Sequence, residues 1–551
     1  MTTVRDASPA PTAAPTSATR PGPARVVPET ELTLLLDVGT AWTKAALVGR
    51  AGGRWRIVSG TAQPTSWGES VLVEDLVDRL APHADNRLAR RLAILVREAP
   101  RITCRSPRRA GRMALVAASA RDLEAARIVA VRSGWIVDAA VSTADGRTDA
   151  ERFDLLRRVE ADAWLVVPGH TSSTASLWGL TAGARGRGSA PVLVAGGAEE
   201  EIQAYAQLFG GGARRVSGGV DDALAQALLV QLTATHGLDD PRLATPIAFG
   251  RSLDALARGL GLSVLGVDLG AMWLGWRQGP DPGAGRAAML AGNFESTLPA
   301  GSRAAAEILP ADVDEFTTTD AMAGLAARRA GIPATPIEAA IAQAIGIDRL
   351  AAARHWLGGT PSVDLVVGAG RLLAAAPHPA DAAMVLLDGL RPPGVTQLAL
   401  DPWGICGPLG ALAEADVDEG LETLRDDLLV PLGTSVLAQG GKPGQTAFRA
   451  RLHRAGWPDS LPVEVRGGSM TVLPLERGAN GDLEIELERG VHVGTSVRGP
   501  RLRAAVTGGS VGVILDARDD PIQLPARPGD ARSVIQTWRD TLRREGHGIT
   551  G

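Results

Sequence analysis

The chain has 551 residues, of which 45% are hydrophobic and 21% charged, a composition typical of a globular protein with about two to four domains. The formal net charge of −4 gives no electrostatic reason to expect nucleic acid or an acidic membrane as a partner. The two cysteines, Cys104 and Cys406, are too few for a disulfide framework or a cysteine metal site, so a reducing, cytoplasmic location is expected.

The N-terminal segment carries no pattern for export or membrane insertion. Residues 1–30 are rich in Ala, Pro, Thr and Ser, which predicts a disordered tail. A basic region followed by an apolar stretch is missing there, and no run in the chain reaches about eighteen uninterrupted apolar residues. We therefore expect neither a signal peptide nor a transmembrane helix.

The stretch 32–48, LTLLLDVGTAWTKAALV, holds the first candidate site. Its apolar start, 32–36, predicts a buried strand, and 43–48 predicts a second strand that runs back along it. A dinucleotide-binding fold or a P-loop would place a helix after the turn instead. A strand in that place resembles the phosphate-binding hairpin of the actin-like ATPase superfamily (actin, sugar kinases, Hsp70).

Four residues of this hairpin suit phosphate chemistry. Gly39 and Thr40 offer backbone N–H groups and a hydroxyl to a phosphate. Lys44 adds a point charge, and Asp37 can hold Mg²⁺ through water. Lysine occurs only twice in the chain, at Lys44 and Lys442, and an arginine is too bulky to replace it simply in a tight phosphate loop. The alternative is an ordinary hairpin with a conformationally useful glycine.

The opening pattern returns in the second half of the chain. Strands and helices first alternate through 113–235, which is typical of an α/β fold. At 262–270 a buried strand again ends in Asp-x-Gly, at Asp268 and Gly270. This recurrence predicts a duplicated fold of two lobes with a nucleotide between them. The next residues, 271–274, are Ala-Met-Trp-Leu, so the second phosphate site lacks the hydroxyls of the first.

Three later stretches complete the chain. The buried strand at 363–370 opens into a glycine turn at Gly368 and Gly370, which in actin-like proteins lies against the adenosine. From about residue 431, short alternating strands separated by glycines predict a small β-rich domain. The last stretch, 530–545, has apolar residues on one helical face, which predicts a docking helix.

Together these segments resemble the glutamate mutase L family (MutL or GlmL) of the actin-like ATPase superfamily. The likeness lies in DVGTAWTKAALV at 37–48, VLVAGGAEEEIQ at 192–203, VDLGAMW at 267–273, ILPADVDEF at 308–316, the stretch 364–401, and the C-terminal RGGSMTVLPL and GGSVGVILDARDDPIQLP. The 364–401 stretch, followed by Gly-Pro-Leu-Gly at 407–410, is the most specific part.

The resemblance implies an α/β, duplicated two-lobe actin-like (ribonuclease H-like) fold with a small C-terminal β-rich domain. The lobes would span 31–245 and 246–430, and the β-rich domain 431–551. The cofactors would be ATP and Mg²⁺, and the role that of a chaperone-like or reactivating factor for a coenzyme-B12-dependent mutase. The sequence has no Asp-x-His-x-x-Gly cobalamin motif, so the chain is not itself expected to be a B12 enzyme.

The same resemblance assigns roles to individual residues. The first phosphate site would consist of Asp37 (also the metal residue), Gly39, Thr40 and Lys44; the second of Asp268, which would position the attacking water, and Gly270; and the adenosine-side turn of Gly368 and Gly370. The family tends toward Asp-x-Gly-Gly-x-Thr-Thr at the second site and toward a double glycine where this chain has Gly370-Arg371. Both departures weaken the case for ATP hydrolysis.

Two alternatives therefore stay open. One is a catalytically inactive actin-like scaffold that recruits a protein partner, which the degraded 271–274 loop favours. The other is a small-molecule kinase of the same superfamily, for which neither an acceptor-binding loop nor a catalytic aspartate is evident in the sequence. Neither alternative changes the expected fold.

Overall fold

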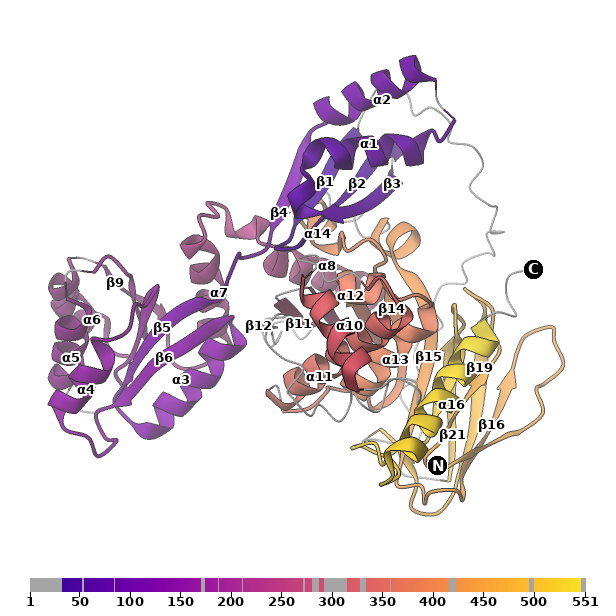
Figure 1. The fold of residues 1–551 in the computed structure, drawn as a ribbon. Helices are drawn as coiled ribbons and strands as arrows, with labels where there is room; N and C mark the ends of the chain where they lie inside the picture. Colours follow the sequence, from indigo (N-terminus) through magenta and orange to yellow (C-terminus); the bar gives the residue numbers. More distant parts are fainter. Residues whose placement is uncertain are drawn as a thin grey trace.

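The computed structural model describes residues 32–51, 54–83, 85–169, 174–186, 188–210, 212–270, 273–279, 287–291, 315–327, 333–356, 358–415, 423–494 and 500–546. The predicted tail, 1–30, and residues 271–272 of the second turn lie outside these ranges. The described part is a mixed α/β structure arranged in four sheets (Figure 1). Across those ranges, no helix combines the length and the apolar character needed to cross a membrane.

The first sheet is built on the predicted opening hairpin, which is confirmed. Its strands are β1 (Leu32–Val38), β2 (Trp42–Ala51), β3 (Arg54–Pro64) and β4 (Arg101–Arg105), in the order β3-β2-β1-β4. β1 and β2 pair antiparallel, with Asp37 opposite Lys44, and β4 lies parallel to β1 on its other side. Helices α1 (Glu69–Leu80) and α2 (Asn86–Glu98) cover the face of β1 that carries Leu34 and Leu36.

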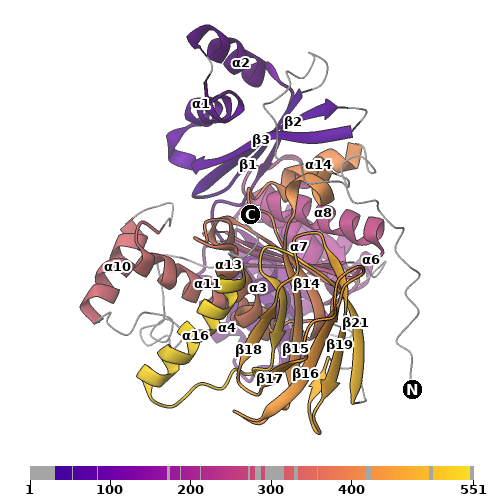
Figure 2. The same cartoon turned by 90° about the vertical axis from the view of Figure 1, so that its right-hand side faces the viewer.

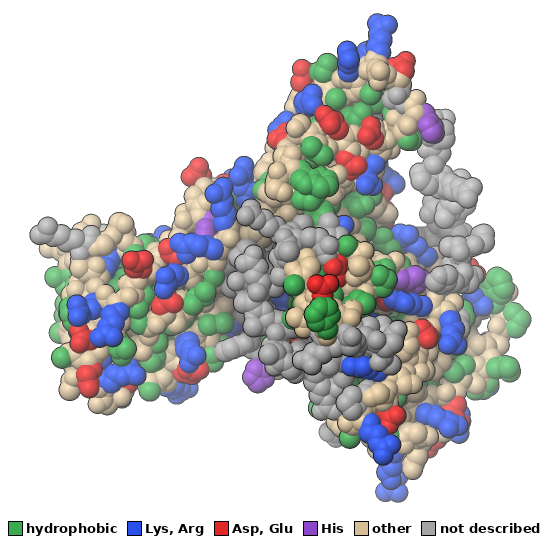
Figure 3. All heavy atoms as spheres, in the orientation of Figure 1, with side chains coloured by type: hydrophobic (Ala, Val, Ile, Leu, Met, Phe, Trp, Pro, Cys, Tyr) green, Lys and Arg blue, Asp and Glu red, His purple; other side chains and the backbone are tan. Residues whose placement is uncertain are grey.

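A parallel α/β unit follows, as the alternating pattern predicts. Its strands are β5 (Gly111–Ala117), β6 (Trp135–Ser142), β7 (Ala163–Val167), β8 (Val192–Ala195) and β9 (Ala213–Ser217), in the order β6-β5-β7-β8-β9. Helices α3 (Ala120–Arg132) and α7 (Asp222–Thr235) pack on one face, and α4 (Asp149–Leu156), α5 (Ala175–Arg185) and α6 (Glu199–Ala206) on the other. The unit projects to one side in Figure 1, and its basic and acidic side chains are interspersed on the face shown in Figure 3.

The buried strand predicted at 262–270 is also confirmed, and it forms a second hairpin with the strand that follows it. It opens a sheet of β10 (Val264–Leu269), β11 (Trp273–Gly279), β12 (Ala287–Ala291), β13 (Leu365–Ala369) and β14 (Gly394–Leu400), in the order β12-β11-β10-β13-β14. β10 pairs antiparallel with β11 and parallel with β13. The strand that carries Asp-x-Gly thus has the same neighbours as β1: an antiparallel hairpin partner on one side and a later parallel strand on the other.

The segment after residue 431 divides between two sheets. The second hairpin's sheet continues through β15 (Val430–Gln439), β22 (Gly512–Asp516) and β18 (Met470–Leu473), with the short β20 (His492–Val493) paired to β15. A separate sheet of β17 (Val463–Arg466), β16 (Thr446–His453), β19 (Asn480–Leu487) and β21 (Arg501–Thr507) shares a core with β15 and β22.

Helices cover the outer face of the second hairpin's sheet. They are α10 (Glu315–Ala327), α11 (Pro336–Trp356), α13 (Pro379–Leu390) and α16 (Pro528–Gly546). The predicted C-terminal docking helix is confirmed, because α16 buries Ile535, Trp538 and Leu542 in this core. Short turns complete the chain: η1 (Thr65–Trp67), η2 (Gln207–Phe209), η3 (Pro241–Leu243), α12 (Arg371–Ala374) and a π-helical turn, η4 (Leu424–Leu428).

A helical layer separates the two hairpin-bearing sheets and positions the candidate site. Helices α8 (Thr245–Leu260) and α14 (Cys406–Ala415) share one core with Leu35 of β1 and Val264 of β10, and Figure 2 shows both helices below the first sheet. Because side chains alternate along a strand, Asp37 lies on the same face as Leu35, and Asp268 on the same face as Val264. Both aspartates therefore lie on the sheet faces that meet this layer.

Candidate functional site

The first turn pairs a buried carboxylate with a buried ammonium. Lys44 Nζ donates to Asp37 Oδ2 at 2.7 Å, and the two residues are only 7% and 1% exposed. Burial alone would lower the pKa of Lys44, but the carboxylates of Asp37, Asp268 and Asp401 together raise it above its usual value. The ammonium therefore stays charged, and it marks the point on which three carboxylates converge.

Gly39 shapes the turn between these two residues. Its N–H donates to Trp42 O at 2.9 Å, and its carbonyl accepts from Thr65 Oγ1 at 3.1 Å. A Cβ on Gly39 would lie 2.7 Å from Trp42 O, so the bend has room only for glycine. Thr40 lies half-buried within the bend. The four residues predicted for the first phosphate site are thus brought together on one turn.

Asp37 is also held by a residue that the sequence analysis missed. Thr245, the first residue of α8, donates Oγ1 to Asp37 Oδ1 at 2.5 Å. Since Lys44 occupies the other oxygen, both carboxylate oxygens of Asp37 accept a hydrogen bond. Thr-Pro at 245–246 is a signal for the start of a helix. Nothing in that local pattern links it to a strand 208 residues earlier.

Asp268 occupies in β10 the place that Asp37 occupies in β1, one residue before the strand ends. Its Oδ1 atom is enclosed, yet it has no hydrogen-bond partner among the residues that the structure describes. Burial raises the pKa of Asp268, the Lys44 ammonium opposes that rise, and the net direction is upward. An enclosed carboxylate oxygen without a partner is unfavourable, so it indicates a site that a ligand or its water completes.

Two glycine turns close around Asp268. Arg349 of α11 donates Nη1 to Gly270 O at 2.8 Å, and burial lowers the pKa of its guanidinium to about 10 against the pull of Asp268. Gly370 has φ of 93°, and a Cβ there would lie 2.5 Å from Asp268 Oδ1, so this turn also requires glycine. Gly368 lies inside β13, where a Cβ would meet the neighbouring leucine side chains.

Asp401 is a third carboxylate of the cluster, and the sequence analysis missed it as a site residue. It follows β14, is fully buried, and accepts from the backbone N–H groups of Trp403, Gly404 and Cys406 at 3.1, 2.7 and 2.8 Å. Burial raises its pKa to about 6, although these N–H groups favour the carboxylate. A Cβ on Gly404 would lie 2.8 Å from Lys44 Cδ, so the turn packs on the lysine stem.

A signal for Asp401 exists in the sequence. The buried strand 394–400 ends in Asp-Pro-Trp-Gly, and it is therefore a third buried strand that ends next to an aspartate. β1 is parallel to β4, and β10 is parallel to β13 and then β14, so aspartates at the carboxyl ends of β10 and β14 lie at one edge of the sheet.

The cluster fits Mg²⁺ that arrives with a phosphate ligand better than a resident ion. Within the described ranges no group of three or more His, Cys, Asp or Glu side chains is arranged to hold a metal by itself. Mg²⁺ bound to a nucleotide needs only one or two carboxylates, because phosphates and waters supply its other ligands. Asp268 Oδ1 could accept a hydrogen bond from water bound to such an ion, whereas Asp37, the predicted metal residue, already accepts two hydrogen bonds.

Comparisons with known proteins give distant structural similarity. No protein-family model matches the chain, and no curated protein matches it in sequence. A nucleotide-free structure of acetone carboxylase, from work on ATP-dependent acetone carboxylation, is 11% identical over 79% of this chain and 81% of that chain, with a TM-score of 0.31. Two Aquifex aeolicus Ppx/GppA structures cover 73% of this chain and 95% and 92% of theirs, at 10% and 11% identity, each with a TM-score of 0.19. At TM-scores this low, the likeness carries no functional assignment, which must come from the geometry of the site.

Proposed function

We propose that this chain is an actin-like nucleotide-binding protein that holds ATP and Mg²⁺ between its two hairpin-bearing sheets and hydrolyses the ATP slowly. One observation carries the proposal: two Asp-x-Gly turns from different sheets converge on Lys44, and Asp268 Oδ1 beside it has no partner among the described residues. The repeated strand order around β1 and β10 supports a duplicated two-lobe fold.

Each residue has a role that follows from its position. Phosphate oxygens compete with Asp37 for the Lys44 ammonium and accept from the backbone N–H and hydroxyl of Thr40, because the Gly39 N–H already donates to Trp42 O. Mg²⁺, when bound, neutralises charge that develops on the phosphates. Asp268 accepts a hydrogen bond from a water molecule and orients it toward the terminal phosphate. Asp401 keeps the turn above Lys44 in place through three backbone N–H groups.

The cellular role that we propose is nucleotide-dependent assistance to another enzyme. The two sheets share a core with α8 and α14, so a ligand that draws the two turns together can change how the sheets are presented to a partner. The partner class, a coenzyme-B12-dependent mutase in the cytoplasm, comes from the motif resemblance alone. Reactivation of an inactivated mutase by the chain with ATP would support this role, and a source genome without any B12-dependent mutase would contradict it.

An inert scaffold is the second candidate, and one observation favours it. Both oxygens of Asp37 already accept hydrogen bonds, from Lys44 and from Thr245, so the first turn is stable without a phosphate. A scaffold of this kind would recruit its protein partner with the same affinity whether or not ATP is present. Nucleotide binding separates the two candidates directly.

The deciding experiment is calorimetry of the full chain with ATP or ADP in the presence of Mg²⁺. Lys44→Ala should weaken binding by roughly 10- to 100-fold, because it removes a charge-assisted hydrogen bond to phosphate. Lys442→Ala is the matched control, since it removes the only other lysine, which is exposed in the C-terminal region. A folded wild type that binds neither nucleotide would contradict the proposal, and so would equal binding by the two variants.

A further inference from the structure

Arg371 reaches from the sheet of the second hairpin to the first sheet. It is the first residue of α12, directly after the Gly370 turn beside Asp268. Its guanidinium carbon lies 4.4 Å from the ring centroid of Trp42, the first residue of β2. The Trp42 carbonyl in turn accepts the hydrogen bond from Gly39 that closes the first phosphate turn. A cation from the second hairpin's sheet therefore rests on the turn of the first.

The charge of Arg371 is not balanced by carboxylates in the way that the charge of Arg518 is. Its Nε is enclosed without a hydrogen-bond partner in the described part of the chain, and burial lowers the pKa of the half-buried guanidinium, with no carboxylate of the described residues opposing that change. Arg518 also stacks on a tryptophan, Trp538, at 4.6 Å, and its Nη1 has no described partner either, but its charge is balanced by ion pairs with Asp388 and Asp516. Stacking on an indole therefore does not by itself account for an enclosed arginine in this molecule.

We infer that Arg371 is a phosphate-binding residue of the proposed nucleotide site. Stacking on Trp42 fixes the plane of its guanidinium, and a planar fork that is already oriented loses little entropy when it binds a phosphate. Arg371 contacts Trp42 beside the Gly39 turn, and the preceding residue, Gly370, lies against Asp268; these are the two places where the proposed nucleotide brings its phosphates. The family that the chain resembles tends toward glycine at this position. A glycine could not supply this charge. The inference rests on the proposed function and adds a residue to it.

This role predicts a specific pattern of binding. Arg371→Ala should weaken ATP and ADP by roughly 10- to 100-fold, because a hydrogen-bonded charge pair with phosphate is lost. Adenosine, which has no phosphate, should bind Arg371→Ala and wild type equally. Arg371→Lys should recover only part of the affinity, since an ammonium keeps the charge but neither stacks as a plane nor donates as a fork.

The experiment is displacement of a fluorescent ATP analogue from the full chain by ATP, ADP and adenosine, for wild type and both variants. Arg454→Ala is the matched control, because Arg454 stacks on the exposed Trp457 at 4.8 Å in the C-terminal region. Tighter ATP binding by Arg371→Ala would overturn the inference and show that the arginine side chain obstructs nucleotide binding. An equal loss for adenosine would overturn it as well, in favour of contact with the base or sugar. A wild type that binds no nucleotide contradicts the proposed function itself, and this role with it.

Discussion

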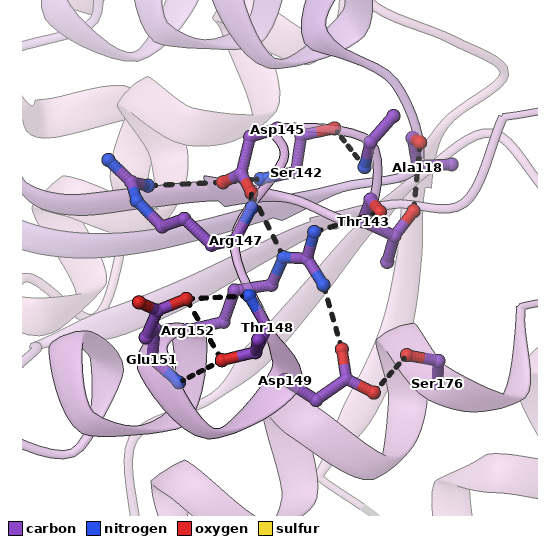
Figure 4. A network of polar contacts seen from close by, with 11 residues as sticks. Ala118, Ser142, Thr143, Asp145, Arg147, Thr148, Asp149, Glu151, Arg152 and Ser176 are labelled. Atoms are coloured by element: carbon purple, nitrogen blue, oxygen red, sulfur yellow. Dashed lines mark hydrogen bonds and ion pairs between the residues drawn. The ribbon is translucent and has the colours of Figure 1, made fainter.

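Two polar clusters in this molecule use the same residue types and differ in how completely those residues pair. At the carboxyl edge of the parallel sheet, Arg152 donates Nε to Asp145 Oδ1 at 3.0 Å, Nη1 to Asp149 Oδ1 at 2.8 Å and Nη2 to Thr143 O at 3.0 Å (Figure 4). At the proposed nucleotide site, Asp268 Oδ1 and Arg371 Nε are enclosed but have no partner among the described residues.

The Arg152 cluster finds its hydrogen-bond partners within the protein, whereas the cluster around Asp268 and Arg371 leaves polar atoms without described partners. Arg152 uses each of its three kinds of nitrogen within the protein, and a capping box between Thr148 and Glu151 fixes the start of α4 beside it. The proposed nucleotide site has an acceptor at Asp268 and a donor at Arg371 that form no hydrogen bond with the described protein groups. A phosphate with Mg²⁺-bound water offers the complement of both, an acceptor for the guanidinium and a donor for the carboxylate.

The largest effect that we expect concerns turnover. Asp268→Asn should lower ATP hydrolysis by roughly 100-fold or more, because the amide orients water poorly and accepts no proton, while ATP affinity changes little. Asp149→Asn, in the Arg152 cluster, is the control and should hydrolyse ATP like the wild type. Steady-state phosphate release measures both. Turnover by Asp268→Asn at the wild-type rate would remove Asp268 from the mechanism.

Replacing Arg152 and replacing Arg371 should change the free energy of unfolding by different amounts. Arg152→Ala removes one of the partners of Asp145, together with hydrogen bonds to Asp149 and to Thr143 O, and should lower the free energy of unfolding by about 2 kcal/mol. Arg371→Ala removes an enclosed cation that pairs with no described carboxylate, so its free energy of unfolding should stay within about 0.5 kcal/mol of wild type or rise. Urea denaturation at one pH compares them. Equal losses would show that Arg371 is a structural residue like Arg152.

The pH dependence of stability should have opposite signs in the two regions. Burial raises the pKa of Asp401 from 3.8 to about 6, so the folded state binds the extra proton between these values. Its contribution to stability therefore falls as pH rises from about 4 to 6, by up to about 3 kcal/mol. The pKa of Asp145 is lowered, since backbone N–H groups and Arg152 outweigh its partial burial. Its contribution is present above pH 4 and is lost as pH falls through the lowered value.

The measurement is the free energy of unfolding from pH 3 to 7 for wild type, Asp401→Asn and Asp145→Asn. The difference between wild type and Asp401→Asn should decrease as pH rises from 4 to 6. The difference between wild type and Asp145→Asn should decrease as pH falls below 4. Two difference curves with the same slope would show that the carboxyl groups do not titrate as their surroundings require.

Features that depend on neighbours in the chain were predictable from the sequence. Both Asp-x-Gly hairpins follow from apolar strands with a turn between them, and α16 follows from apolar residues on one helical face. Contacts between distant segments were not predictable, because a local pattern carries no information about them. Thr245 on Asp37 and Arg371 on Trp42 are of this kind. The strand order of the parallel sheet belongs with them, since β5 pairs with β7, which does not follow it directly in the chain.

A last comparison takes one glycine from each region. Gly370 has φ of 93° with Asp268 Oδ1 2.5 Å and Leu269 O 2.4 Å from an added Cβ, whereas Gly146, between Asp145 and Arg147, has φ of 76° and open space around it. Gly146→Ala should cost about 1 kcal/mol of folding free energy from its backbone alone, and Gly370→Ala about 2 kcal/mol more, because Leu269 O is backbone and cannot move aside. Only Gly370→Ala should also weaken ATP binding, since the displaced turn shifts Asp268 and Arg371 together. Thermal unfolding with and without ATP measures both effects, and an equal ATP-induced shift for the two variants would show that the Gly370 turn is not part of the ligand site.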